Sequence, residues 1–365
     1  MEFRINRNDF FKGLQRVQSI STTRGTMPIL ANILIKASGE KVSIFATNLE
    51  IGLKGEYEAQ VVEEGAITVS AKKVHDIVRE LPTGEILVKE SDGRLRLSYG
   101  NSRFNLATLP SADYPSFLDF KESNFIKLKS KLLADMIRKT SYAISKDETR
   151  RTLTGALLEI DPKSTKMVAT DGHRLGLVER AGSFKVTDNI KIIVARKAIE
   201  ELSKLILESD GDIEFLAHDN YIIFKIENQY MSAKLIEGAF PNYDQVIPKE
   251  HTAEVNISKE AFYYTLRRVS TLADEKSHMV KLTFHNDKLS FMSEGGGIGE
   301  ARDELEIKYS GERIEIGLNS NYLLDLLNAI DGDEVKIKIS DLLGPLLIES
   351  ESDEKSIGII MPMRL

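Results

Sequence analysis

The sequence contains no cysteine and no tryptophan among its 365 residues. Without cysteine the chain can have no disulfide scaffold, thiolate metal site or cysteine nucleophile, and this is typical of proteins from a reducing cytoplasm. It has no run of eighteen apolar residues, so no membrane-spanning helix is expected. The first ten residues, MEFRINRNDF, hold no apolar stretch, and we therefore expect no secretory signal.

The composition is ordinary for a globular protein, with 42% hydrophobic and 29% charged residues. The length allows two or three domains of usual size. The net charge of −7 argues against nucleic acid as a partner, unless the basic residues gather on one surface.

A short strand followed at once by an amphipathic helix occurs three times at a constant interval. The strands at 66–70, 192–194 and 314–318 lead into AKKVHDIVREL, ARKAIEELSKL and NSNYLLDLLNAI. Lys73, Lys197 and Asn321 then occupy equivalent positions, 124 residues apart. EFRIN, FIKLK and AEVNI, each before another such helix, form a second set at nearly the same interval. Because chance rarely preserves an interval in two independent sets, we infer an internal repeat.

Alternating strands with turn residues between them follow the helices, as in ANILIKA, VSIFATN and IGLKGEYE. Each third of the chain therefore has the pattern strand–helix–three strands, twice over. The pattern predicts an α+β protein of three similar domains, at residues 1–121, 122–248 and 249–365.

Five of the six predicted helices are apolar on one face and basic on the other, whereas the last one, NSNYLLDLLNAI, has no basic residue. Phe10, Phe11, Leu14 and Val17, for example, share one helical face. If the apolar faces pack on sheets, the basic faces can form a surface that binds phosphates without reading bases. The alternative for any single helix is that its basic residues only solvate an exposed face. The basic residues that carry the expectation are Arg7, Lys72, Lys139, Arg196, Lys197 and Arg267.

Charge is distributed unevenly along the chain, with net charges of +1, 0 and −8 in the three thirds. Arginines cluster in the first third and acidic residues in the last, so a head-to-tail contact between two copies would pair them, and such a contact can close into a ring. The alternative is that the acidic residues only keep the chain soluble. The two groups are Arg94, Arg96 and Arg103, and Glu300, Asp303, Glu304 and Glu306.

Two stretches carry unusual chemistry. Val168–Glu179, VATDGHRLGLVE, predicts two strands joined by a tight Asp-Gly turn. Ile359–Leu365, IIMPMRL, predicts an apolar strand at the chain end, which must be either frayed or tied down.

Two enzyme-like interpretations are weaker. A hydrolase built on Asp171, His173 and Arg174 would need an orienting partner and a nucleophile or metal, and the six histidines show no metal-ligand spacing. The glycines at 295–297 are not followed by Lys-Ser/Thr, so they favour a flexible β-loop over a phosphate loop. A repeat scaffold that binds proteins only is a third possibility, and it would not distinguish circular from linear DNA.

Four motifs closely resemble the β subunit of bacterial replicative DNA polymerase III, the sliding clamp: TRGTMPILANILI at 23–35, ATDGHRL at 169–175, GAFPNYDQVIP at 238–248 and MPMRL at 361–365. The resemblance runs over essentially the whole chain. It implies two chains closed head to tail into a ring of six similar domains, with helices lining a hole for double-stranded DNA. It also implies a cytoplasmic protein with no reaction, cofactor or metal of its own.

The resemblance further implies partners and sites. DNA polymerase III α subunit, an ATP-driven clamp loader and repair factors would dock through short peptides that carry a Gln and hydrophobic residues. Arg24 would face DNA, whereas Arg151-Thr152, where the family often has aromatic residues, puts aromatic DNA contacts there in doubt. The peptide pocket would use Arg150, Leu153, Thr170, Gly172, His173, Arg174, Leu175, Pro241, Val246, Pro345, Ile359, Met361, Pro362 and Met363. The dimer interface would use Lys73, Arg96, Arg103, Phe104, Leu106, Leu272, Glu300 and Glu304.

Overall fold

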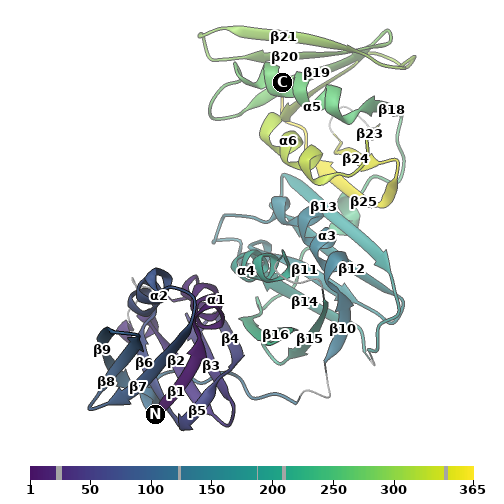
Figure 1. Cartoon of the computed structure of the whole chain (residues 1–365). Helices are drawn as coiled ribbons and strands as arrows, with labels where there is room; N and C mark the ends of the chain where they lie inside the picture. Colours follow the sequence, from purple (N-terminus) through teal and green to yellow (C-terminus); the bar gives the residue numbers. More distant parts are fainter. Residues whose placement is uncertain (22–26, 122–124, 187, 208–210, 341–343) are drawn as a thin grey trace. The chain divides into compact units, whose positions relative to one another are not determined.

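The computed structural model describes residues 1–21, 27–121, 125–186, 188–207, 211–340 and 344–365. Figure 1 shows the helices and strands of the whole chain. Internal contacts divide the chain into two compact units. Unit 1 comprises Met1–Ser130 and Lys204–Leu235, and unit 2 comprises Lys131–Ser203 and Ile236–Leu365. No helix in the described ranges is long and apolar enough to cross a membrane.

The six predicted copies of strand–helix–three strands are all present, so the repeat is confirmed. The first pair comprises β1 (Glu2–Asn6), α1 (Arg7–Gln18), β2 (Asn32–Ser38), β3 (Lys41–Thr47) and β4 (Ile51–Glu58), then β6 (Gly65–Ser70), α2 (Ala71–Glu80), β7 (Glu85–Ser91), β8 (Arg94–Tyr99) and β9 (Ser102–Pro110). An additional short strand, β5 (Gln60–Glu63), lies between the two copies and was not predicted.

The later copies follow the same order. The second pair comprises β10 (Ile126–Lys129), α3 (Ser130–Thr140), β11 (Gly155–Ile160), β12 (Ser164–Thr170) and β13 (Arg174–Ala181), then β14 (Ile190–Ala195), α4 (Arg196–Leu207), β15 (Asp212–His218), β16 (Tyr221–Ile226) and β17 (Gln229–Lys234). The third pair comprises β18 (Ala253–Ser258), α5 (Lys259–Ser270), β19 (Met279–His285), β20 (Lys288–Glu294) and β21 (Glu300–Glu306), then β22 (Ile314–Asn319), α6 (Ser320–Ala329), β23 (Glu334–Ile339), β24 (Leu346–Ser350) and β25 (Asp353–Ile360).

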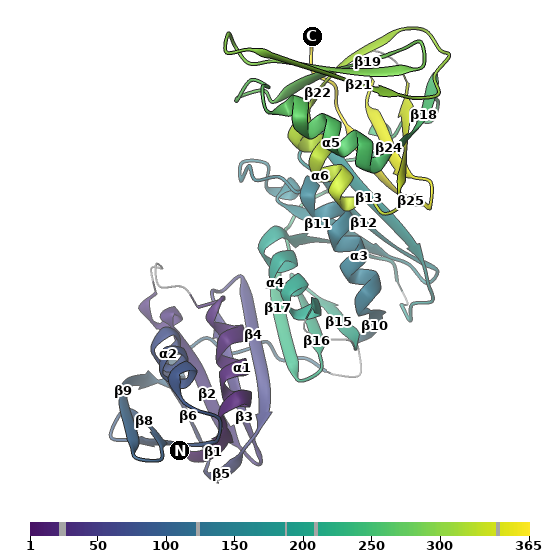
Figure 2. The ribbon, with the colours of Figure 1, turned by 45° about the horizontal axis from the view of Figure 1, so that its top comes forward.

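The strands of unit 1 form one antiparallel sheet in the order β10-β15-β16-β17-β4-β3-β2-β6-β9-β8-β7-β1-β5. The pairing of β17 with β4 explains why residues of the second third belong to this unit. Helices α1 and α2 lie side by side against the sheet (Figure 2). Phe10, Leu14 and Val17 of α1 are buried there, as predicted. Phe11 instead stacks on His75 of α2, with ring centroids 5.2 Å apart.

Unit 2 contains an eight-stranded sheet, β14-β11-β12-β13-β25-β24-β23-β18, and a four-stranded sheet, β21-β20-β19-β22. In the eight-stranded sheet the β13·β25 ladder joins strands of the second third of the chain to strands of the last third. Its register runs from Arg174 opposite Ile360 to Val178 opposite Ser356. The candidate site is built around this ladder.

Local chemistry sets the helix starts and the hairpin turns. The side chains of Asn6, Ser70, Ser258 and Asn319 accept hydrogen bonds from the first backbone N–H groups of α1, α2, α5 and α6. The glycines at 295–297 lie in the β20–β21 hairpin, so the loop prediction is confirmed and no helix N-terminus opens there to bind phosphate.

Candidate functional site

The Asp-Gly turn predicted between 170 and 174 joins β12 to β13, and its polar groups satisfy one another. The Asp171 carboxylate accepts hydrogen bonds from the backbone N–H groups of His173 (2.9 Å) and Arg174 (3.0 Å). The Thr170 hydroxyl donates to the Arg174 carbonyl at 2.7 Å. Gly172 has φ +88°, a conformation that glycine adopts without strain. Asp171 thus holds the turn together.

Arg174 is held rigidly beside the turn. Its guanidinium pairs with Asp171 (3.0 Å) and Asp325 of α6 (2.6 Å), and it lies 4.4 Å from the centroid of the Tyr322 ring. Only 10% of the side chain is exposed. Arg174 was expected to line the peptide pocket, and these contacts hold its side chain in the wall of the site.

An apolar cluster lies beneath the turn. It includes three residues expected from the sequence, Leu153, Leu175 and Ile359, which are at most 8% exposed. The cluster also contains residues that sequence reasoning missed: Leu157, Val168, Leu177, Ile193, Phe240 and Tyr243. The signal for Leu177 was available, because residues two apart on a strand face the same side. The signal for Phe240 was its place beside Pro241 in the GAFPNYDQVIP motif.

The residues at the chain end are held in place by hydrogen bonds, which is one of the two alternatives expected from the sequence. The Met361 N–H donates to the carbonyl of His173 at 2.8 Å, and the Met363 N–H donates to the carbonyl of Gly317 at 2.8 Å. Met361, Pro362 and Met363 remain partly exposed. They therefore form a stationary apolar wall that a ligand can still touch.

The remaining expected pocket residues lie around this wall. His173 and Pro241 are exposed, and Val246 is 39% exposed. The side chain of Arg150 approaches the turn so closely that a Cβ on Gly172 would lie 2.9 Å from its Nη1 atom. Pro345 directly precedes Leu346, which is paired with Ile360 at the end of β25.

Of the basic residues expected to face DNA, Lys72, Lys197 and Arg267 are exposed on α2, α4 and α5. Arg196 is one-third exposed and lies 3.9 Å from Glu200. Arg7 is half-buried, because its guanidinium donates to the carbonyls of Val78 (3.0 Å) and Arg79 at the end of α2. Arg24 lies outside the described residues.

Lys139 corrects the sequence prediction. Its side chain is 4% exposed and its Nζ atom lies within ion-pairing distance of three carboxylates, those of Asp135, Asp331 and Asp353. It cannot be a phosphate-binding group on an exposed helix face. The error arose because two of these carboxylates come from segments about 200 residues away, which a helical pattern does not show.

Two strand edges carry the residues expected at a dimer interface. β21 is the edge strand of the four-stranded sheet. In β9, Ser102–Ala107 pair with β8 and only Thr108–Pro110 pair with β6. Arg103 of β9 and Arg96 of the neighbouring β8 are exposed, and Phe104 and Leu106 of β9 are half-buried. Lys73 is exposed on α2, and Leu272 is half-buried beyond the end of α5.

The acidic residues of β21 have neighbours within the chain. Glu300 pairs with Arg302 (3.2 Å) and Glu304 with Lys288 (2.8 Å). The hydrogen bond from Lys288 lowers the pKa of Glu304. These are exposed pairs, which contribute little to stability and can be exchanged for other partners.

The fold is that of solved sliding clamps. The structure of the DNA polymerase III subunit beta from Pseudomonas aeruginosa matches with a TM-score of 0.96 and 32% identity, over 100% of both chains. A sliding clamp from Bartonella birtlesii, solved with griselimycin bound, matches with a TM-score of 0.95 and 34% identity, also over 100% of both chains. The chain therefore has the three-domain, α+β sliding clamp fold.

Sequence comparisons give the same result for each third of the chain. The N-terminal, central and C-terminal domains of the DNA polymerase III beta subunit match residues 1–119, 127–242 and 244–364. The beta sliding clamps of Pseudomonas putida and Caulobacter vibrioides are 32% and 34% identical, over 100% of both chains in each case. This chain belongs to the DNA polymerase III beta subunit family.

Membership confirms the resemblance seen in the motifs. The protein is a DNA sliding clamp of DNA replication, a non-catalytic processivity factor and not a hydrolase. A dimeric ring, encirclement of DNA and binding of clamp-binding-motif proteins such as the polymerase all fit the family.

Proposed function

We propose that partner proteins dock on this clamp through one peptide-binding slot per chain. The slot is defined as the surface between the 171–173 turn, the apolar cluster under it and the terminal residues Met361–Met363. The observation that carries the proposal is the hydrogen bond between the Met361 N–H and the His173 carbonyl, which holds the chain end against the turn. A partly exposed apolar wall therefore faces a turn with exposed polar groups.

The composition of the slot suits the peptides expected for this family. Leu153, Leu175 and Leu177 offer a buried apolar floor for hydrophobic side chains. Met361 and Met363 can adapt to different side chains, because methionine is unbranched and flexible. His173 and Arg150 are exposed at the rim and can hydrogen-bond a Gln side chain or the peptide backbone. The expected ligands are the DNA polymerase III α subunit, the clamp loader and other clamp-binding-motif proteins.

DNA contact is assigned to the exposed basic residues of the helices: Lys72, Lys197 and Arg267, with Arg196 beside them in sequence. Long, exposed cations bind phosphates without reading bases, which suits a clamp that must slide. Arg24 remains an expected contact outside the described residues. Arg7 and Lys139 are not included, because their donors are engaged within the protein.

Ring closure is assigned to β9 of one protomer and β21 of a second copy. Both strands have backbone groups along one edge that no described neighbour pairs, and such an edge readily accepts another strand. Phe104 and Leu106 supply apolar contact, and Arg96 and Arg103 would face the acidic residues Glu300 and Glu304 of the opposite edge.

The domain limits follow the repeat at 1–121, 122–248 and 249–365, and the three matched family segments support them. Because a bacterial clamp works on chromosomal DNA, we place the protein in the cytoplasm.

The slot is tested with a double change, His173→Ala together with deletion of Met363–Leu365. This change removes the exposed His173 side chain and the terminal residues from Met363 on, whose N–H donates to the Gly317 carbonyl. Titration of a fluorescein-labelled synthetic peptide containing one Gln and two Leu residues is expected to show binding to the parent and none to the variant. His218→Ala, an exposed histidine of β15, is the matched control and should bind like the parent.

Native mass is measured in parallel by light scattering, and both variants should remain dimers. Unchanged peptide affinity in the double variant would reject this location for the slot. Retention of the parent on circular DNA, and its loss after the circle is cut, separates an encircling clamp from a protein-only scaffold.

A further inference from the structure

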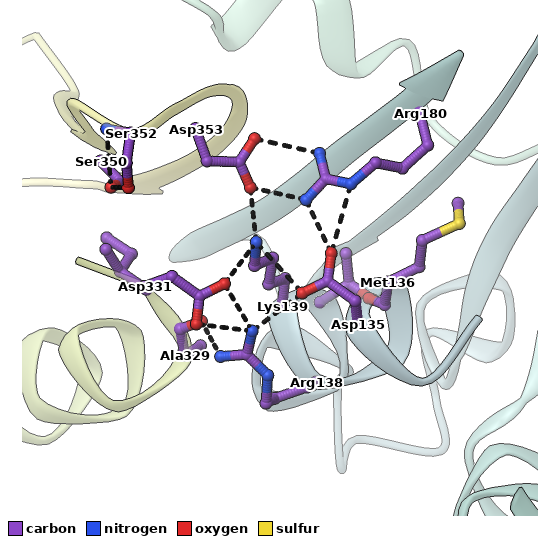
Figure 3. Close-up of polar contacts among 12 residues, drawn as sticks. Asp135, Met136, Arg138, Lys139, Arg180, Ala329, Asp331, Ser350, Ser352 and Asp353 are labelled. Atoms are coloured by element: carbon purple, nitrogen blue, oxygen red, sulfur yellow. Dashed lines mark hydrogen bonds and ion pairs between the residues drawn. The ribbon is translucent and has the colours of Figure 1, made fainter. Parts of the chain in front are cut away.

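Six charged side chains of unit 2 are joined to one another by ion pairs and are here called the ion cluster: Asp135, Arg138, Lys139, Arg180, Asp331 and Asp353. Figure 3 shows Lys139 at its centre, with its Nζ atom directed at all three carboxylates. Arg180 bridges Asp135 (2.7 Å) and Asp353 (2.5 Å), and Arg138 bridges Asp135 and Asp331 (2.8 Å each). Every carboxylate therefore has at least two cationic partners.

The cluster is balanced only when two separate parts of the chain come together. Helix α3 and strand β13 contribute three cations and one carboxylate, a net charge of +2. Asp331 follows α6 and Asp353 begins β25, and together they contribute −2. Arg138 also donates to the carbonyl of Ala329, the last residue of α6, at 2.6 Å. Because unpaired buried charge is costly, this arrangement strongly favours one placement of β25 beside β13.

The ion cluster lies at one end of the β13·β25 ladder and the slot lies at the other. Arg180 is two residues beyond Val178, the last residue of β13 that pairs with β25, and Asp353 precedes Ser356 on β25. At the opposite end, the Met361 N–H reaches the His173 carbonyl. In the middle, Gly176 faces Gly358, a pair that has no side chains with which to hold the two strands together.

We propose that Lys139 and its ion cluster are positioning residues for the peptide slot: they fix β25 against β13, and β25 in turn holds the terminal wall opposite Leu175 and Leu177. The inference rests on the proposed slot. None of the cluster residues is expected to touch the peptide.

Hydrogen bonds within the cluster favour the charged forms of Asp135 and Lys139. Burial opposes the charge on Asp135, but hydrogen bonds from Arg180 and Lys139 outweigh it and lower the pKa of Asp135. The pKa of Lys139 is raised in spite of its burial, because Asp331, Asp353 and Asp135 accept its hydrogen bonds. A cluster of this kind resists small shifts of β25, since each shift breaks several charge-assisted bonds at once.

The test uses the full-length dimer and the same labelled peptide. Lys139→Met keeps an apolar stem of similar length and removes the central charge. We expect peptide affinity to fall about five- to thirtyfold, the upper part of the range for residues that act on a site without touching it. The control is Lys338→Met, which removes the ion pair of Lys338, 23% exposed, with the buried Glu349 (2.5 Å) in the β23·β24 ladder of the same sheet. The control should change affinity less than twofold.

Two further readouts separate positioning from a general loss of stability. Hydrogen exchange, followed by mass spectrometry, should speed up in the fragment 357–365 of Lys139→Met and stay unchanged in 157–168, which contains the paired strands β11 and β12. Arg180→Lys, which keeps a cation beside Asp353, should recover most of the affinity that Arg180→Met loses.

Each outcome decides between the two proposals. If His173→Ala with the terminal deletion binds normally, the slot itself is wrong. If that variant fails to bind while folded Lys139→Met binds like the parent, the slot stands and the positioning role is overturned. Should Lys139→Met not fold, Asp331→Asn, whose side chain is 50% exposed, replaces it with an expected loss of about two- to fivefold, and an unchanged affinity there also overturns the proposal.

Discussion

Substituting Gly176 by alanine should measurably destabilise this clamp. Gly176 lies in the middle of β13, opposite Gly358 of β25. A Cβ at Gly176 would lie 2.8 Å from the carbonyl oxygen of Lys139 and 3.1 Å from the Cα of Thr140. Both atoms are backbone at the end of α3, so no side-chain rotation can make room. Either the helix end or the strand must move.

The magnitude follows from competing effects. Burying one methyl group favours folding by about 0.8 kcal/mol. Overpacking that forces a backbone shift costs about 1–3 kcal/mol, and the contact here is with backbone, so the upper part of that range applies. We expect Gly176→Ala to lower the free energy of unfolding by about 2 kcal/mol.

Urea unfolding followed by far-ultraviolet circular dichroism measures this change as a lower midpoint. Gly299→Ala is the matched control, because the nearest atom to its added Cβ is the Leu272 Cδ1 atom at an ordinary 3.6 Å. The control should stay within about 0.5 kcal/mol of the parent. A Gly176→Ala protein as stable as the control would refute the reasoning, since it would show that α3 and β13 separate at no cost.

Two other predictions concern charge. Arg103→Glu should weaken the dimer about tenfold, because it puts like charges at an edge expected to meet Glu300 and Glu304. Sedimentation should show more monomer than for the control Arg4→Glu on β1, a strand that β8 and β7 separate from β9. Equal association of the two variants would count against β9 as the interface. Burial opposes the charge on Asp331, but hydrogen bonds from Lys139 and Arg138 outweigh it and lower the pKa of this carboxyl. The stabilising contribution of Asp331 is therefore present above its unfolded pKa of about 3.9. It is lost as the pH falls through the lower folded pKa. The difference in unfolding free energy between parent and Asp331→Asn should therefore be constant near neutral pH and shrink below about pH 4; a gap that stays constant in urea titrations down to acid pH would exclude this linkage.

The repeat could be predicted from sequence because it rests on local rules. Strand alternation and helix periodicity are properties of neighbouring residues, and the turn at Asp171 and Gly172 is determined by its own side chains. β5 escaped prediction because QVVE is only four residues long and follows β4 without a turn signal. Its structure depends on pairing with β1, which lies about 60 residues earlier in the chain.

The errors at the site have a common physical origin. Lys139 looked like a solvent-facing cation because an α-helix pattern shows only which residues share a face. Its burial is decided by Asp331, which follows α6, and by Asp353, which begins β25. The ion pair of Arg174 with Asp325 was missed for the same reason, since Asp325 belongs to a helix more than 100 residues away. Long-range ion pairs leave no periodic trace in a single sequence.

A binding wall made from the last residues of a chain has a particular physical difficulty. Chain ends fray, because each ordered residue costs about 1–2 kcal/mol of backbone entropy and a typical hydrogen bond returns only about 0.5–1.5 kcal/mol. The bonds at Met361 and Met363 cannot by themselves order this segment. The remaining stabilisation has to come from β25, where Ile359 and Ile360 are at most 1% exposed. The slot therefore inherits its geometry from the placement of β25, so substitutions along the β13·β25 ladder should alter partner binding even where no partner touches them.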